Sequence, residues 1–292
     1  MASVVINVDS SRSLYPENNY FCAMNRKSLL PLLFGLFIIL TSCSKYQKLL
    51  KSTDNEQKYE MAFAYFEDKD YYRAIQLFDQ LQAFYRGTDK AERIAFYYAY
   101  AHYEQRDYIL ASYYFKQFAR SYPNSKNAEE SAYMSAYCNY LDSPPSSLDQ
   151  TVTLDAIKDL QLFINQYPKS ERVVKANGLI DELRMKLETK AYDIAFLYFK
   201  MNDYKATILN FQNLIKDFPD TKYRESAMYH IAKAYYSYAE KSIDSKKAER
   251  YQHTYDAIDN FASYFPESGN IKELRAIQKN AQKQLSNLSA LQ

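Results

Sequence analysis

Large apolar residues recur along this chain in a repeated helical pattern. Five segments carry such residues seven, ten and fourteen positions after a common starting point, as Phe115, Phe118 and Tyr122 follow Tyr108. Steps of three, four and seven residues bring side chains to one face of a helix. The pattern therefore predicts five helices of similar length, each with one apolar face. The other four sets are Phe78, Leu81 and Tyr85; Leu160, Phe163 and Tyr167; Phe211, Leu214 and Phe218; and Ile258, Phe261 and Phe265.

Turn signals mark both ends of these helices. Proline follows the last aromatic residue in four segments, and a proline disfavours helix at the residue before it. A Ser or Thr two positions later is expected to cap the next helix by accepting from its free backbone N–H groups. Asp70, Asp107 and Asp203 precede a tyrosine where a second helix should start, and we expect them to cap it. Each unit therefore reads as helix, turn, helix. The Pro-x-Ser/Thr turns run 123–125, 168–170, 219–221 and 266–268.

The helix before each segment carries a small residue and an aromatic residue three positions apart. Ala62 and Tyr65 form one such pair, and Ala195 with Tyr198 and Ala232 with Tyr235 form two more. Together with the Ala-x-x-x-Phe pattern of the following helix and the terminal proline, this resembles the tetratricopeptide repeat, which has a period of about 34 residues. Departures include Thr207 at an alanine position and His102 at a tyrosine position. The resemblance implies an all-α solenoid of about five helix pairs.

Two interruptions divide the predicted repeats. A proline-rich stretch at 143–147 predicts a loop inside the third repeat, and the run 171–201 has no proline and predicts one long helix or two helices nearly in line. We expect N-terminal repeats 1–3 at residues 55–170, a long connecting helix region at 171–201 and C-terminal repeats 4–5 at 202–292. The segment from Ile271 to Leu288 predicts a last amphipathic helix that caps the stack.

The N-terminal region has the pattern of a signal peptide. Basic residues after Met24 precede an apolar run at 28–40, which is shorter than the roughly 20 residues that span a bilayer. The run ends in Leu40-Thr41-Ser42-Cys43, which resembles the bacterial lipobox. That resemblance implies that Cys43 receives a diacylglycerol, that residues 1–42 are removed, and that further acylation, with chains such as palmitate, anchors the protein in a lipid membrane. Residues 43–54 would form the lipidated tether.

The residue after the lipidation position bears on the location of the protein. Ser44 resembles the residue that lets lipoproteins of didermic bacteria be sorted to the outer membrane, and no acidic run of the kind that accompanies surface export follows Cys43. We therefore expect the protein at the periplasmic face of the outer membrane.

The amino-acid composition limits the classes of fold and function that we expect. The chain has 31 Tyr and only 4 Gly, which suits packed helices better than sheets with many tight turns. A net charge of +2 from 37 basic and 35 acidic residues gives no reason to expect a nucleic-acid partner. Cys138 is the one cysteine after the lipobox, so we expect no internal disulfide in that part of the chain. We expect Cys138 itself to be buried as a small apolar residue.

The sequence shows no catalytic constellation. His102, His230 and His253 are isolated, with no cysteine or acidic residue at metal-ligand spacing, so we expect no metal, no cofactor and no enzymatic activity. A glycan-cleaving enzyme with paired carboxylates stays open as an alternative that an activity screen would decide.

The tyrosines of the first helices are the best candidates for a binding surface. Tyrosine offers a large contact area with a hydrogen-bonding tip, which suits a peptide-binding groove. Tyr97, Tyr98 and Tyr100 lie too close in one helix to face the same way, so some must be core. The candidate client-binding groove consists of Tyr65, Tyr97, Tyr98, Tyr103 and Tyr137.

The lipobox, the repeat endings and the long connecting helix together resemble the BamD family, the tetratricopeptide-repeat lipoproteins of the β-barrel assembly machinery. The matching stretches are 120–125, 165–170 and 216–221. The resemblance implies that the N-terminal repeats bind unfolded outer-membrane proteins and the C-terminal repeats bind POTRA domains of the barrel insertase, beside other lipoproteins of the machinery. The alternative is another periplasmic repeat lipoprotein that acts as a cell-envelope or glycan-binding adaptor.

Overall fold

The computed structural model describes residues 45–290, and the chain divides into two compact units, Met1–Lys58 and Tyr59–Gln292. In the described part of the first unit, residues 45–51 are helical and Tyr46 is buried. Helix α2 (Asn55–Glu67) begins in the first unit and continues into the second. Cys43 and the predicted signal peptide lie outside the described residues.

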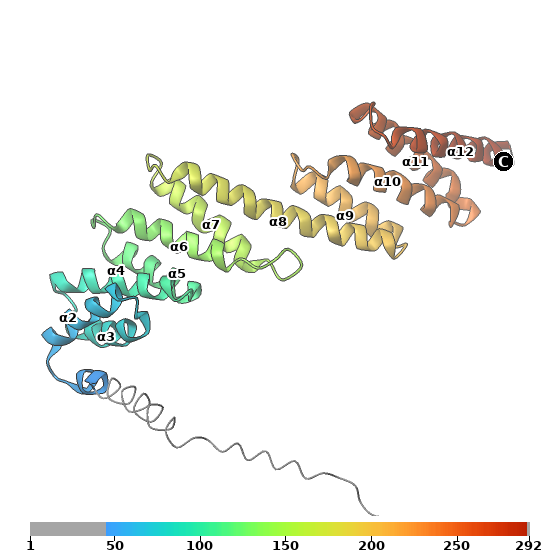
Figure 1. The fold of residues 1–292 in the computed structure, drawn as a ribbon. Coiled ribbons are helices and arrows are strands. Elements are labelled where there is room, and N and C mark those ends of the chain that lie inside the picture. Colours follow the sequence, from blue (N-terminus) through green and yellow to red (C-terminus); the bar gives the residue numbers. More distant parts are fainter. Residues whose placement is uncertain (1–44, 291–292) are drawn as a thin grey trace, which may run out of the picture. The chain divides into compact units, whose positions relative to one another are not determined.

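The second unit is built from helices alone over its described residues (Figure 1). After α2 they are α3 (Tyr71–Phe84), α4 (Asp89–Glu104), α5 (Tyr108–Ser121), α6 (Ala128–Asp142), α7 (Thr151–Gln166), α8 (Val173–Lys200), α9 (Tyr204–Asp217), α10 (Arg224–Glu240), α11 (Asp244–Tyr264) and α12 (Ile271–Ala290).

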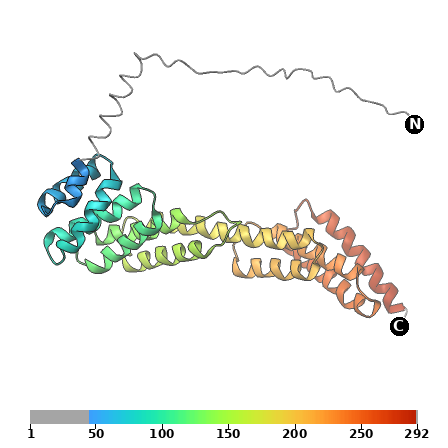
Figure 2. The ribbon, with the colours of Figure 1, turned by 90° about the horizontal axis from the view of Figure 1, so that it is seen from below.

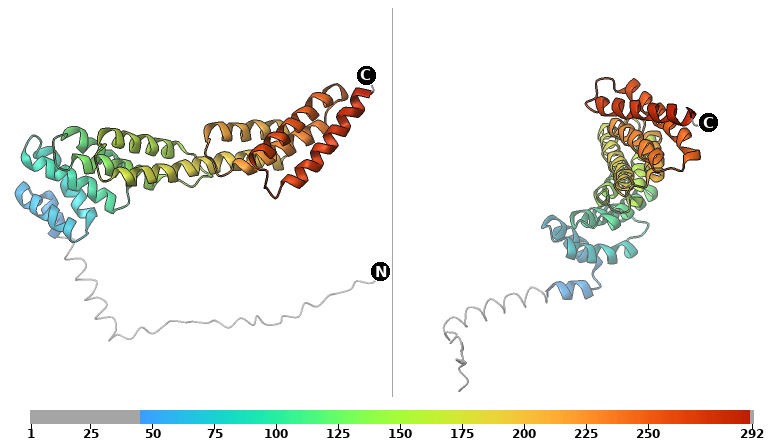
Figure 3. Two further views of the ribbon diagram at one scale, coloured as in Figure 1. Left: turned by 90° about the horizontal axis from the view of Figure 1, so that it is seen from above. Right: turned by 90° about the vertical axis from the view of Figure 1, so that its right-hand side faces the viewer.

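Neighbours in the chain are neighbours in space. From α3 to α12, each helix packs against the next one in chain order, and α10 also contacts α8 and α12 (Figures 1 and 2). Helices α2, α4, α6, α8 and α10 are the first helices of the repeats, and α3, α5, α7, α9 and α11 are the second helices. This arrangement confirms the predicted all-α helical-repeat fold. The expected final helix is α12, which packs on α11 (Figure 3).

The repeated apolar triads form the core. The first two residues of each triad are almost completely buried; for example, Phe115 and Phe118 are 0% and 1% exposed. Burying a side chain of this size contributes about 1.5–3 kcal/mol. The same face of every second helix therefore supplies the main apolar surface of its repeat. The other buried pairs are Phe78 and Leu81, Leu160 and Phe163, Phe211 and Leu214, and Ile258 and Phe261.

Three aspartates cap second helices as predicted. The side chains of Asp70, Asp107 and Asp203 accept hydrogen bonds from the backbone N–H three residues ahead. The residue before each aspartate has a positive φ near 60°, although none of the three is glycine. This left-handed residue lets the aspartate N–H reach back to a carbonyl of the first helix, and so closes the turn tightly. The three left-handed residues are Lys69, Arg106 and Asn202.

The Pro-x-Ser/Thr turns differ in detail from the prediction. Ser125 lies three residues before α6, so it is not the residue at which the helix starts. Its Oγ accepts from the N–H of Asn127 at 3.0 Å and donates to the Glu92 carboxylate of α4 at 2.6 Å. The serine therefore orders the turn and also links two successive first helices. Ser170 with Glu129 and Ser268 with Glu225 repeat the link at 2.6 Å each.

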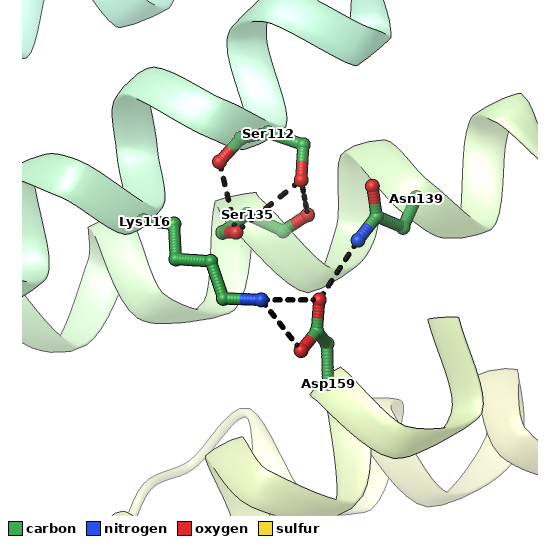
Figure 4. Close-up of polar contacts among 5 residues, drawn as sticks. All are labelled: Ser112, Lys116, Ser135, Asn139 and Asp159. Carbon is green, nitrogen blue, oxygen red and sulfur yellow. Dashed lines mark hydrogen bonds and ion pairs between the residues drawn. The ribbon is translucent and has the colours of Figure 1, made fainter. Parts of the chain in front are cut away.

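A polar cluster joins α5, α6 and α7 (Figure 4). The Nζ of Lys116 lies 2.9 and 3.0 Å from the two carboxylate oxygens of Asp159, and the amide of Asn139 donates to the same carboxylate at 2.9 Å. Beside them, the hydroxyls of Ser112 and Ser135 each donate to the other residue's carbonyl, at 2.9 and 3.0 Å. These hydrogen bonds give partners to polar side chains that lie where the second helices α5 and α7 pack against the first helix α6.

The long run after Glu171 forms one uninterrupted helix, α8, of 28 residues. The loop between α6 and α7 is held against its middle, because Lys186 donates to the Ser143 carbonyl at 3.0 Å and Lys190 donates to that of Leu148 at 2.5 Å. The buried Gln150 side chain donates to further loop carbonyls. The loop is therefore fixed against α8 by side-chain hydrogen bonds.

Candidate binding surfaces

Tyr97 lies in an aromatic layer between the first helices α2 and α4. Its ring is 5.0 Å from the rings of both Phe63 and Phe66. The guanidinium of Arg93, one turn earlier on α4, lies 4.1 Å from the Phe63 ring and 5.7 Å from the Tyr97 ring. The Tyr97 ring therefore has both aromatic and cationic neighbours, and groups of these two kinds can bind aromatic rings and peptide groups.

Tyr103 of α4 and Tyr137 of α6 are close enough to interact electrostatically. Burial raises the pKa of Tyr103, and the neighbouring Tyr137 hydroxyl adds to the effect. Tyr137 stacks between Tyr133 and Tyr140, with centroid distances of 5.8 Å on both sides. The hydroxyl of Tyr140 donates to Glu182 of α8 at 2.5 Å, and this bond, more than burial, raises the Tyr140 pKa to about 12. The stack makes a row of three aromatic rings along α6, in which Tyr133 is buried and Tyr137 and Tyr140 are partly exposed.

Tyr98 points to the other side of α4. It is 5% exposed, and its ring lies 4.5 Å from Tyr114 of the second helix α5. Its hydroxyl is 3.5 Å from that of Tyr114, and burial raises its pKa. As expected, the tyrosines of this helix divide between faces. The structure gives Tyr98 a packing role and does not bring it together with Tyr97.

Tyr65 is half-buried on α2, with the guanidinium of Arg73 5.6 Å from its ring. The cations beside these rings were not part of the sequence prediction. Arg93 precedes Tyr97 by four residues, a helical spacing that could have indicated it. Lys175, 5.1 Å from the Tyr137 ring, comes from α8 and has no local sequence signal.

Two of the three histidines are packed into aromatic surroundings. His102 is 6% exposed between Tyr98 and Tyr114, and burial lowers its pKa against the opposing effect of Asp107. His230 stacks on Phe211, and burial lowers its pKa too. His253 is exposed. Within residues 45–290 no three His, Cys, Asp or Glu residues are grouped as metal ligands would be.

Cys138 has the buried role that the sequence predicted. It is a free thiol with no exposed surface, and burial raises its pKa to about 12. A thiol held protonated in the core is a poor nucleophile. In the described part of the chain, no helix is long and apolar enough to cross a lipid bilayer.

Comparison with known proteins identifies the family. The family model YfiO, described as an outer membrane lipoprotein, matches residues 51–251, well over half of the chain. The match covers every repeat from α2 to the first part of α11. A search of curated proteins gives no match. The repeat endings in the sequence resemble those of the BamD family, and the YfiO model represents that family. The chain therefore belongs to the YfiO family of outer membrane lipoproteins.

Proposed function

We propose that this protein is a scaffold of the β-barrel assembly machinery, anchored in the outer membrane by lipid on Cys43. In this proposal the N-terminal repeats bind unfolded outer-membrane proteins and the C-terminal repeats bind POTRA domains of the barrel insertase. Other lipoproteins of the machinery would assemble around it. The membership of the chain in an outer membrane lipoprotein family is the observation that carries the proposal.

The aromatic face of the first helices suits an unfolded barrel protein. Strands of such clients alternate apolar and polar residues and carry aromatic residues near their ends. The rings of Tyr97, Tyr103 and Tyr137 offer stacking area, and Arg93 and Lys175 beside them offer cationic groups. Contacts of this kind tolerate many sequences because they need only a ring or an apolar side chain. A chaperone-like receptor for many clients needs that tolerance.

The C-terminal repeats offer a different surface for the insertase. A notch of about 560 Å³ lies between α9, α10 and α11, with an apolar floor that includes Ile215, Met228 and Ile231 and a polar rim of Arg224 and Asp256. A folded domain such as POTRA can place an apolar anchor on such a floor and pair its polar groups with the rim. This notch supports the assignment of the POTRA-binding role to the C-terminal repeats.

The anchor in this proposal is a short one. Residues 45–51 are helical, and a helix advances about 1.5 Å per residue where an extended chain advances about 3.5 Å. The tether between Cys43 and α2 is therefore shorter than the roughly 40 Å that an extended segment would reach. A short tether suits a receptor that works beside the membrane.

The test of client binding is a comparison of matched tyrosine variants. Tyr97→Ala with Tyr137→Ala removes two rings of the first-helix face, whereas Tyr72→Ala with Tyr113→Ala removes two exposed rings of second helices. Binding of a urea-unfolded, fluorescently labelled barrel protein is measured on dilution. We expect the first pair to weaken binding by at least about tenfold, from roughly 1 kcal/mol per ring, and the control pair to leave it unchanged. Equal effects of the two pairs would contradict the proposal.

A further inference from the structure

The turns that lead into the first helices form one continuous edge of the N-terminal repeats. The ring of Tyr59, near the start of α2, lies 5.7 Å from the ring of Tyr85 at the end of α3. Ser125 and Ser170, in the next two turns, donate to carboxylates in the first turns of α4 and α6. Each turn therefore lies beside the start of the preceding first helix. The three turns are 85–88, 122–127 and 167–172.

These three turns are basic, and we call them together the basic edge. Each has a net charge of +1, which comes from Arg86, from Lys126, and from Lys169 and Arg172 against Glu171. Arg86, Lys126 and Lys169 are exposed, and none of the three has an ion-pair partner within residues 45–290. Each N-terminal repeat therefore offers at least one free cation at this edge.

Other turns of the second unit lack this charge. In the C-terminal repeats, the turn between α9 and α10 has Asp220 against Lys222, and the turn between α11 and α12 has Glu267 alone. At the opposite edge of the N-terminal repeats, the turns between α2 and α3, α4 and α5, and α6 and α7 have net charges of −1, 0 and −1. Among the turns of the first three repeats, positive charge is therefore confined to the edge at which the first helices start.

Carboxylates in the neighbouring helix ends reduce this charge without reversing it. Glu92, Glu129 and Glu130 lie in the first turns of α4 and α6, and the last two are 3.4 and 3.7 Å from the Arg172 guanidinium. With one helical turn on either side of each connecting turn included, the basic edge has 7 cations and 5 carboxylates. The opposite edge, counted in the same way, has 3 cations and 7 carboxylates. The two edges of the N-terminal repeats are therefore opposite in charge.

Exposed apolar side chains lie among the cations of the basic edge. Phe84, the last residue of α3, is 60% exposed near Arg86, and Val174 at the start of α8 is 83% exposed next to Lys175. Cations with a few apolar side chains are typical of surfaces that bind the interface of an anionic bilayer. The opposite edge exposes apolar side chains as well, such as Ile109 at 68%, but its excess of carboxylates disfavours an anionic surface. The charge therefore distinguishes the two edges.

The chain enters the second unit at the basic edge. This unit begins at Tyr59, whose ring lies 4.6 Å from the Nζ of Lys90 at the start of α4. The proposed lipid anchor, Cys43, precedes α2 by a tether shorter than roughly 40 Å. The opposite edge lies a helix length further along the chain, about 24 Å for α4. The point of attachment therefore favours the same edge as the charge does.

We propose that the basic edge lies against the anionic phospholipid headgroups of the membrane that holds the anchor. The inference rests on the lipid anchor of the proposed function and goes beyond it, because an anchor alone does not fix which edge faces the bilayer. Each Lys or Arg near an anionic surface strengthens binding about fivefold, so a few cations can orient a tethered protein that the lipid holds. The first helices then lead away from the bilayer, and Tyr97 and Tyr137 lie only about 12–14 Å along α4 and α6 from their starts.

The test measures which edge faces the lipid. The lipidated full chain is reconstituted into vesicles that contain phosphatidylglycerol and a trace of rhodamine-labelled lipid, and floated with them. Fluorescein is attached at Val174→Cys on the basic edge or at Ile109→Cys on the opposite edge; Cys138 is buried and stays unlabelled. We expect energy transfer to the lipid to be at least about twofold greater from Val174→Cys, because the two sites lie about a helix length apart. The difference should disappear in vesicles of neutral phosphatidylcholine and in high salt.

The outcomes separate the orientation from the anchor. Equal transfer from the two labels, or greater transfer from Ile109→Cys, in protein that floats with the vesicles overturns the orientation and leaves the anchor standing. Protein that does not float lacks the anchor, and this result overturns both. A difference that persists unchanged in neutral vesicles would show that the cations do not set the orientation.

Two matched triple variants test the location of the charge. One neutralises the free cation of each basic turn, with Arg86→Gln, Lys126→Gln and Lys169→Gln. The control removes the same charge from α12, with Lys272→Gln, Lys279→Gln and Lys283→Gln. All six side chains are exposed, so circular dichroism should show unchanged helix. We expect the first variant to abolish the difference between the two labels and the control to leave it unchanged. If both variants abolish it, net charge and not the basic edge sets the orientation, and the proposed location is wrong.

Discussion

His102 and His230 are packed among aromatic rings. The His230 Nδ1 donates to the Ser226 carbonyl at 2.7 Å, and its ring lies within 6 Å of the rings of Phe196, Phe199, Phe211 and Tyr229. Burial lowers the pKa of both histidines below the usual 6.5. The unfolded chain therefore binds more protons near pH 6 than the folded chain does, and acid favours unfolding.

This predicts a stability loss between pH 7.5 and 5.5. The free energy of unfolding should fall as pH drops below 6.5, with a slope of at most about 1.4 kcal/mol per pH unit for each histidine. His102→Phe keeps a ring in the same place and should make the slope shallower. His253→Phe, at an exposed position, is the control and should leave it unchanged. Urea unfolding at a series of pH values measures the slopes, and identical slopes for wild type and His102→Phe would contradict this explanation.

At the scale of the element, local pattern predicted most of the helices. Apolar spacing and proline placed the second helices because both act within one turn of the chain. The aspartate caps followed for the same reason. The left-handed residues before the aspartates could not be predicted in this way. Lys69 and Arg106 are not glycines, and they adopt a positive φ only because the tertiary turn requires it.

Features that depend on two distant helices could not be read from the sequence. The link between Ser125 and Glu92 joins residues 33 apart, and the pattern alone suggested a helix cap. The direction of Tyr98, toward Tyr114 instead of toward Tyr97, is set by which helix covers which face.

The Lys116–Asp159 ion pair should be worth more than a surface pair. Asp159 is 14% exposed at its side chain and also accepts from Asn139, so loss of one partner leaves a half-buried charge without its main contact. In a double-mutant cycle with Lys116→Met and Asp159→Leu, we expect a coupling energy of about 1–2 kcal/mol. The exposed pair Lys246–Glu249 should give less than about 0.5 kcal/mol in the same measurement. Equal couplings in urea unfolding would show that burial of Asp159 has no energetic effect.

At the scale of the whole molecule, the second unit is a linear array of helices. Contacts run between successive helices, as in other repeat proteins, so stability is approximately a sum of repeat and neighbour contributions. Helix α8 contacts α7 and α9 through different parts of its length, because residues 176–183 pack with α7 and Ala195 packs with α9. The array can present separate surfaces along its length, such as the first-helix tyrosines and the α9–α11 notch.

Membrane attachment should depend on Cys43 alone. Several acyl chains anchor a protein firmly, since each buried methylene contributes about 0.8 kcal/mol. Cys43→Ser should therefore release the protein into the soluble fraction while its circular dichroism and unfolding transition stay the same. Sedimentation of membranes in high salt measures the release. A Cys43→Ser protein that still sediments with the outer membrane would show that the anchor lies elsewhere.

The most direct measurement of the central claim is the composition of the complex that the protein forms in its own membrane. The tagged full chain is purified from outer membranes in mild detergent, and the recovered proteins are identified and quantified by mass spectrometry. The proposed role predicts a barrel protein with POTRA domains in near-stoichiometric amount, lost when the charge at the exposed polar rim of the α9–α11 notch is reversed by Asp256→Lys. Stoichiometric recovery of a different envelope partner, with no such barrel protein, would contradict a role in barrel assembly.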